Sequence, residues 1–178
     1  MTSNRSSTTR LLAGLAAVAL VAGLYTSTAL AAPGRQATAA CNALQLSGKV
    51  RQSSGAAGTI ALSIAFRNIS PATCKLQGFP KLKLRNASGP LPTHVQHGGL
   101  AIFQHPALDV SLAPGKVTSL LVAYSDVPTG SETHCRNATT LVVILGGGSG
   151  RLTVAATIGA CNHGHLFESP FLAGKVNV

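Results

Sequence analysis

The chain has 178 residues, and its fourteen lysines and arginines against four aspartates and glutamates give a formal net charge of +10 at pH 7. Five phenylalanines, two tyrosines and no tryptophan leave few side chains for stacking on bases, which disfavours a dedicated nucleic-acid binder. The four acids, Asp109, Asp126, Glu132 and Glu168, show no spacing that pairs two carboxylates, so glycoside hydrolysis is also disfavoured.

Residues 1–31 are typical of a secretory signal peptide. Arg5 and Arg10 precede an uncharged apolar run at 11–24, and Ala29-Leu30-Ala31 is the small-x-small pattern that signal peptidase recognises. We expect cleavage after Ala31 and a secreted protein, extracellular or associated with the cell envelope. The alternative is an uncleaved anchor. Lipidation of Cys41 is disfavoured, because residues 25–40 separate it from the apolar run.

The mature chain of 147 residues is long enough for one domain with a true core and has no further apolar run that would span a membrane. Residues 32–40 are small and unpatterned and are predicted to be a flexible tether, so the domain is expected over 41–178. Its cysteines, Cys41, Cys74, Cys135 and Cys161, predict two disulfides in an oxidising compartment. The sequence allows three pairings, of which we favour the sequential one, Cys41–Cys74 and Cys135–Cys161.

Strand signals begin at residues 44–52 and are clearest over 59–68. There Ile60, Leu62, Ile64 and Phe66 recur at every second position, the period of a half-buried strand. Residues 81–85 repeat this pattern, with two leucines inward and Lys81, Lys83 and Arg85 outward, before a turn at 86–90.

The outward cations of residues 81–85 form a stripe with a spacing of about 7 Å, close to the charge repeat of a polyphosphate. Lys81, Lys83 and Arg85 are therefore candidate contacts for a polyanion. The alternative is a solvated sheet face whose lysines protect an edge.

Residues 92–107, which contain His94, His97 and His105, are predicted to be a long surface loop. Strands at 110–112 and 116–126 are expected to form a hairpin through Ala113-Pro114-Gly115, and strands at 141–145 and 152–158 another through the glycine-rich 146–150. A last short strand is expected at 165–168. Seven to eight short strands predict an all-β, antiparallel, immunoglobulin-like β-sandwich, with a closed barrel as the alternative.

Several segments together resemble a known family, the secreted bacterial domain of unknown function 4232. They are Cys41, residues 68–80 (NISPATCKLQGFP), residues 110–115 (VSLAPG), Cys135, and Cys161 shortly before Ser169-Pro170. The resemblance covers about residues 41–172. It implies an exported or lipid-anchored envelope protein of high-GC Gram-positive bacteria, with an immunoglobulin-like sandwich and paired cysteines, and it brings no known activity. Tyr124 stands where the family often has tryptophan.

A second cluster, residues 161–165 (CNHGH) with His134-Cys135, offers thiols and imidazoles for zinc or copper. We do not predict a metal site there, because exported Cys135 and Cys161 are expected to be oxidised to each other. If the segment is extended, His163 and His165 alternate onto one face and leave a weak metal site as the alternative.

The chain shows no catalytic motif that we can defend, and no cofactor is predicted. Ser149 fails the G-x-S-x-G pattern because Arg151 occupies the last glycine position. We therefore predict a non-enzymatic exported module that binds or structures the cell envelope, with anionic envelope polymers as candidate partners. The alternatives are a metal-binding protein using clustered histidines and a polyanion-binding module using the basic strand. The sequence does not indicate the oligomeric state.

Overall fold

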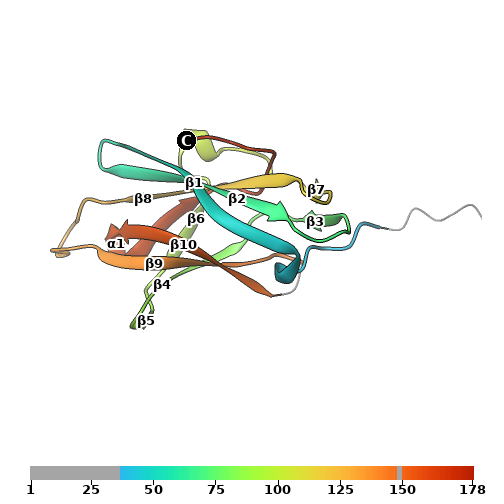
Figure 1. Ribbon diagram of the computed structural model, residues 1–178. Coiled ribbons are helices and arrows are strands. Elements are labelled where there is room, and N and C mark those ends of the chain that lie inside the picture. Colours follow the sequence, from blue (N-terminus) through green and yellow to red (C-terminus); the bar gives the residue numbers. More distant parts are fainter. Residues whose placement is uncertain (1–36, 148–149) are drawn as a thin grey trace, which may run out of the picture. The chain divides into compact units, whose positions relative to one another are not determined.

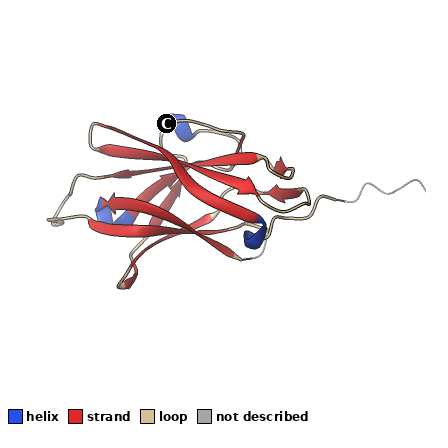
Figure 2. Ribbon diagram, viewed as in Figure 1, coloured by secondary structure: helices blue, strands red, loops and turns tan. Residues whose placement is uncertain are grey.

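A computed structural model describes residues 37–147 and 150–178 (Figure 1). The predicted signal peptide and Ser149 lie outside these residues. Strands make up most of the described chain, and helix is confined to a few short turns (Figure 2). Within the described residues, no helix is long and apolar enough to cross a membrane.

Two main sheets pack face to face. The larger has the strand order β1 (Leu46–Ala56), β2 (Thr59–Asn68), β8 (Val117–Ser125), β11 (His165–Glu168) and β6 (His94–His97), with β12 (Leu172–Ala173) also paired to β8. The second has the order β10 (Arg151–Ala160), β9 (Arg136–Ile144), β4 (Lys81–Asn86) and β5 (Gly89–Pro90). A small sheet joins β3 (Cys74–Leu76) to β7 (Val110–Leu112). Neither main sheet closes on itself, so the architecture is the predicted all-β sandwich.

The core lies between the two main sheets and is built from alternate residues of their strands. Leu62, Ile64 and Phe66 of β2 and Leu82 and Leu84 of β4 are buried in it. The larger sheet is also covered on part of its outer face, where a second apolar cluster joins β8 to the short 3-10 helix Ala101–Phe103 and to the C-terminal segment. This extra layer explains why both faces of β8 are apolar.

Both predicted disulfides are present with the predicted pairing. Cys41–Cys74 ties the entry of the domain, beside a 3-10 helix at Ala43–Gln45, to β3. Cys135–Cys161 joins the residue before β9 to the first residue of the short helix α1 (Cys161–Gly164), which directly follows β10.

The predicted hairpin over residues 110–126 is wrong. The turn at Ala113 to Lys116 forms, with the Lys116 amide donating to the Ala113 carbonyl at 3.0 Å, but its two strands enter different sheets. β7 pairs with β3, while β8 pairs with β2 over nine register positions. The long partner strand outweighs the local turn because it offers many more backbone hydrogen bonds.

The structure has more strands than the seven to eight predicted, and one pair of these strands is parallel. Strand β6 and the 3-10 helix at Ala101–Phe103 both lie within the predicted loop 92–107. β6 runs parallel to β11, which departs from the expected antiparallel arrangement. A four-residue strand with His94 and His97 at its ends has no apolar alternation that a sequence pattern would detect.

The start of the domain also differs in detail. The Lys75 amide donates to the Ala39 carbonyl and the Cys41 amide donates to the Lys75 carbonyl, each at 2.9 Å, so the end of the predicted tether is paired with β3. β1 continues past the predicted end at residue 52 to a tight turn at Ala57 and Gly58, both with positive φ. Paired positive φ values are what a two-residue hairpin turn requires.

Candidate polyanion-binding face

The outer surface of the smaller sheet carries the predicted cationic stripe. Lys81, Lys83 and Arg85 are exposed on β4, whereas the intervening Leu82 and Leu84 are only 4% and 1% exposed. The alternation expected from the sequence therefore points the three cations away from the core. Their neighbours on this surface come from β9 and β10.

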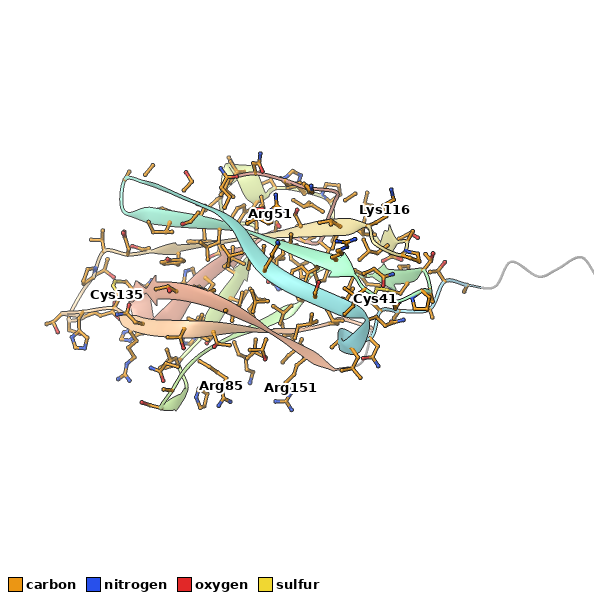
Figure 3. All side chains as sticks on the ribbon, in the orientation of Figure 1. Cys41, Arg51, Arg85, Lys116, Cys135 and Arg151 are labelled. Atoms are coloured by element: carbon orange, nitrogen blue, oxygen red, sulfur yellow. A yellow bond between two sulfur atoms is a disulfide. The ribbon has the colours of Figure 1, made fainter. Side chains whose placement is uncertain are left out.

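Strand register adds a fourth cation. Lys81 is opposite Ile144 of β9, and Ile144 is in turn opposite Arg151 of β10. Because residues in register across adjacent strands share a face, Arg151 lies on the same side as Lys81. We call the surface formed by Lys81, Lys83, Arg85 and Arg151 the β4 face. Figure 3 shows Arg85 and Arg151 on the same side of the domain.

A shallow hollow of about 390 Å³ lies on the β4 face. Val142 and Ile144 contribute its apolar lining, and Lys83, Arg85 and Arg151 contribute the cations. An anionic group bound here would meet guanidinium and ammonium donors beside an apolar surface. Arginine also binds phosphate and carboxylate oxygens through two parallel N–H donors.

No carboxylate opposes these cations. Asp109 is paired with Lys75 at 2.9 Å, an ion pair that lowers the pKa of Asp109 through hydrogen bonding to that lysine. Glu132 accepts a hydrogen bond from the Asn162 amide at 2.6 Å, and Asp126 lies just beyond the end of β8. The β4 face is therefore positively charged without local compensation from the described residues.

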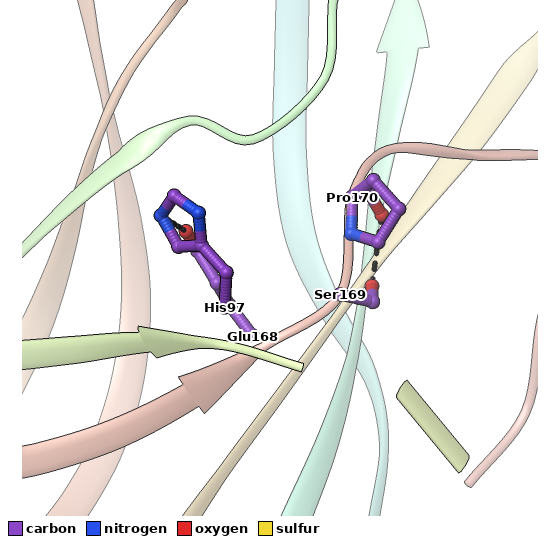
Figure 4. Close-up of polar contacts among 4 residues, drawn as sticks. All are labelled: His97, Glu168, Ser169 and Pro170. Atoms are coloured by element: carbon purple, nitrogen blue, oxygen red, sulfur yellow. Dashed lines mark hydrogen bonds and ion pairs between the residues drawn. The ribbon is translucent and has the colours of Figure 1, made fainter. Parts of the chain in front are cut away.

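A second notable group is the Glu168 carboxylate at the end of β11 (Figure 4). It is 0% exposed, and neither of its oxygens accepts a hydrogen bond from the described residues. Its Oε1 lies 3.2 Å from His97 Nε2 on β6, and the His97 ring stacks on Phe79 with centroids 4.1 Å apart. Burial raises the pKa of Glu168 to about 8, so this carboxyl group holds a proton at neutral pH.

The histidines do not assemble into a metal centre in the part of the chain that the structure describes, where no group of three or more histidine, cysteine or acidic side chains is placed to hold an ion. Cys135 and Cys161 are bonded to each other and supply no thiolates. The alternative of a weak site at His163 and His165 required an extended segment, and this condition is not met, because His163 sits in the turn of α1 with φ of 55° and His165 begins β11. The fold does place His94 opposite His165, a pair that the sequence did not suggest.

Residues 41–171 match the model of one protein family, the Domain of unknown function (DUF4232). The match spans nearly all of the described domain. The chain belongs to the DUF4232 family. No curated protein and no solved structure matches it.

The matched DUF4232 region includes both disulfides and the four cations of the β4 face. The segment 68–80 that carries the resemblance has a clear structural role. Asn68 Nδ2 donates to the carbonyls of Ala72 and Leu112, both at 2.8 Å, and Asn68 Oδ1 accepts from the Ser70 amide at 2.9 Å and the Ser70 hydroxyl at 2.8 Å. This DUF4232 segment therefore fixes the connection from β2 to β3 against β7.

Arg151 is the residue of the β4 face that sequence reasoning did not identify. Its own strand shows the necessary alternation, with Arg151, Thr153 and Ala155 exposed and Leu152 and Val154 buried. The missing information was that β9 lies between β4 and β10, a pairing between segments about sixty residues apart that no local pattern specifies.

Proposed function

We propose that this DUF4232 domain is an exported, non-enzymatic module that binds anionic polymers of the cell envelope through the β4 face. The observation that carries the proposal is the set of four cations on one sheet surface with no carboxylate among them. Electrostatic attraction of this kind concentrates polyanions at a surface and is sensitive to salt.

Export is supported by the N-terminal sequence and by the two disulfides, which persist in oxidising compartments. The net charge of the mature chain, twelve basic against four acidic side chains, favours the same class of partner. The partners that fit this proposal are anionic wall polymers.

The shape of the β4 face favours a polymer over a small anion. Three of its cations are spread along β4 at about 7 Å intervals and the fourth, Arg151, lies two strands away on β10, so one small anion would engage only part of them. None of the described residues that line the hollow is aromatic, which disfavours single-stranded nucleic acid. None of them is a cysteine, histidine or acid that would serve as a nucleophile or general base.

The test is binding of the mature domain to a purified anionic wall polymer. The double variant Lys83→Thr/Arg85→Thr removes two charges from the centre of the β4 face and keeps residues that favour strands. At roughly 1 kcal/mol for each cation near an anionic surface, we expect the affinity of the β4 face itself to fall about thirtyfold at low salt.

The matched control is Thr129→Glu/Ser131→Glu, which lowers the net charge by the same amount in the exposed loop between β8 and β9. This variant should retain most of the affinity. Equal losses in the two variants would mean that only net charge matters and would refute a site on the β4 face.

A further inference from the structure

A second cationic surface lies on the outer side of the larger sheet. It contains Lys49 and Arg51 of β1, Arg67 of β2, Lys116 in the turn before β8, and Lys175 of the C-terminal segment. We call these five residues the β2 face. They were not candidates from the sequence, because they come from four segments that only the fold brings together.

Register and a bulge place the strand residues. Lys49 is opposite Ala65 and Ser47 is opposite Arg67, so both cations lie on the face away from the core. The β1–β2 register shifts between Val50 and Gln52, which leaves Arg51 as the extra residue. A bulge re-aims a side chain, and Arg51 lines the same hollow as Lys49.

Lys175 is held at this surface by buried hydroxyl groups. The Ser119 hydroxyl donates to the Gly174 carbonyl at 2.9 Å and accepts from the Val176 amide at 3.0 Å, and the Ser63 hydroxyl donates to the Val176 carbonyl. Both serines are 1% exposed. The residues on either side of Lys175 are thus fixed to β2 and β8, which positions its ammonium group on the β2 face.

Three adjoining hollows of about 320, 590 and 440 Å³ mark the β2 face, and Arg67 lines all three. Ala65 and Val117 provide small or apolar surface between the cations. None of the residues lining these hollows is acidic. The chemistry is that of the β4 face, with five cations in place of four.

The two cationic faces lie on opposite sides of the sandwich. In Figure 3, Arg51 and Lys116 lie along one side of the domain and Arg85 and Arg151 along the other. Sheets pack about 10 Å apart, so charged groups that extend outward from both are separated by roughly 20 Å. Along β10, the exposed Thr153, Ala155 and Thr157 form an uncharged strip beside the β4 face.

From this arrangement we infer that the domain binds two separate segments of anionic polymer, one on each face, and so crosslinks polymer chains. The inference rests on the proposed function and adds a second site and a bridging role to it. A polyanion laid along one face leaves the other face free, because the faces point in opposite directions and no cationic path joins them along β10.

The experiment is a two-layer capture assay at low salt. A linear poly(glycerol phosphate) is immobilised, the mature domain is bound to it, and a fluorescent sample of the same polymer is then added. We compare wild type with Lys81→Thr/Lys83→Thr/Arg85→Thr and Lys49→Thr/Arg51→Thr/Arg67→Thr, which lose the same net charge from opposite faces. Circular dichroism checks folding, and the milder pair Lys49→Gln/Arg67→Gln replaces the second triple variant if that variant unfolds.

Bridging predicts that wild type binds the first layer and captures the second. Each triple variant should still bind the first layer, through its intact face, and should capture the second at least about tenfold less well. Bridging would be overturned if bound wild type captured no second polymer layer, or if a one-face variant captured it as well as wild type does. In both cases binding of the domain to the first layer would still stand. Loss of first-layer binding in wild type would instead overturn the proposed function itself.

Discussion

Two buried polar residues, Asn68 and Glu168, differ in the hydrogen-bond partners that the fold provides for their side chains. The Asn68 amide has hydrogen-bond partners for both its oxygen and its nitrogen, so its burial costs little. The Glu168 carboxylate has only the nearby His97 ring, on the partly exposed side of β6. Asn68 therefore holds the connection between β2 and β3 in one conformation, whereas Glu168 makes the free energy of unfolding dependent on pH.

The replacement Glu168→Gln tests this pH dependence. Because the pKa of Glu168 rises from 4.5 to about 8 on folding, the folded state holds the proton more tightly than the unfolded state. Its contribution to stability is complete below about pH 4.5 and is lost as the pH rises through about 8, with a slope of up to about 1.4 kcal/mol per pH unit. In urea unfolding, wild type should lose stability from about pH 5 to about pH 9, and the glutamine variant should lose much less.

His97 needs its own control, since its ring lies beside the carboxyl group. His97→Gln removes the imidazole and leaves Glu168 in place. The decline with pH should persist in that variant. If it disappears there and remains in Glu168→Gln, the titrating group is the histidine and our assignment is wrong.

At the scale of elements, β1 closes one edge of the sandwich against β10. Gly48 allows this contact, because a Cβ atom at this position would lie 2.9 Å from Phe66 Cε1 and 2.9 Å from Val154 Cγ2. The approach of β1 to β10 therefore depends on a glycine in the middle of a strand, a position that otherwise weakens a strand.

We expect Gly48→Ala to destabilise the domain. Overpacking a tight core contact costs about 1–3 kcal/mol, which exceeds the gain of about 0.4–1 kcal/mol from restricting the unfolded chain. The free energy of unfolding, measured with urea, should therefore fall. Ser47→Ala is the matched control, because Ser47 is the exposed neighbour on the same strand, and its effect should be small. A Gly48→Ala protein as stable as wild type would show that β1 and β10 shift apart easily.

For the whole molecule, two disulfides stabilise opposite parts of a small domain. Cys41–Cys74 spans 33 residues and Cys135–Cys161 spans 26. Loop closure of this length stabilises by about 3–4 kcal/mol for each bridge. Cys41 and Cys74 are both buried, whereas Cys135 is only half-buried.

The double variants Cys41→Ala/Cys74→Ala and Cys135→Ala/Cys161→Ala should therefore differ. Each loses the loop-closure contribution, but the first shortens two buried side chains and the second only one, Cys161, so the free energy of unfolding should fall further in the first. Urea unfolding of both variants beside wild type measures the order. A larger loss of stability in the second variant would indicate that the region around α1 depends on its disulfide more than the N-terminal end of the domain depends on Cys41–Cys74.

Local patterns in the sequence were sufficient for several features of this protein. The period-2 alternation at 81–85 specified which side chains of β4 face the solvent, and the sequential pairing that we favoured among the three possible ones is the pairing present. These features depend on neighbours in the chain or on a small number of possible partners. The resemblance over residues 41–172 also agrees with the family match over 41–171.

Tertiary structure alone decided which segments lie together. Arg151 lies on the same face as Lys81 because β9 pairs with both of their strands. Lys175 lies near Arg67 because buried serines hydrogen-bond the residues on either side of it, and the Glu168 carboxyl group is fully buried next to His97 of β6. Each is a contact between residues far apart in the chain, set by competition among strands for partners and by burial. Such terms depend on the whole fold, whereas alternation and turn chemistry act within a few residues and can be predicted from them.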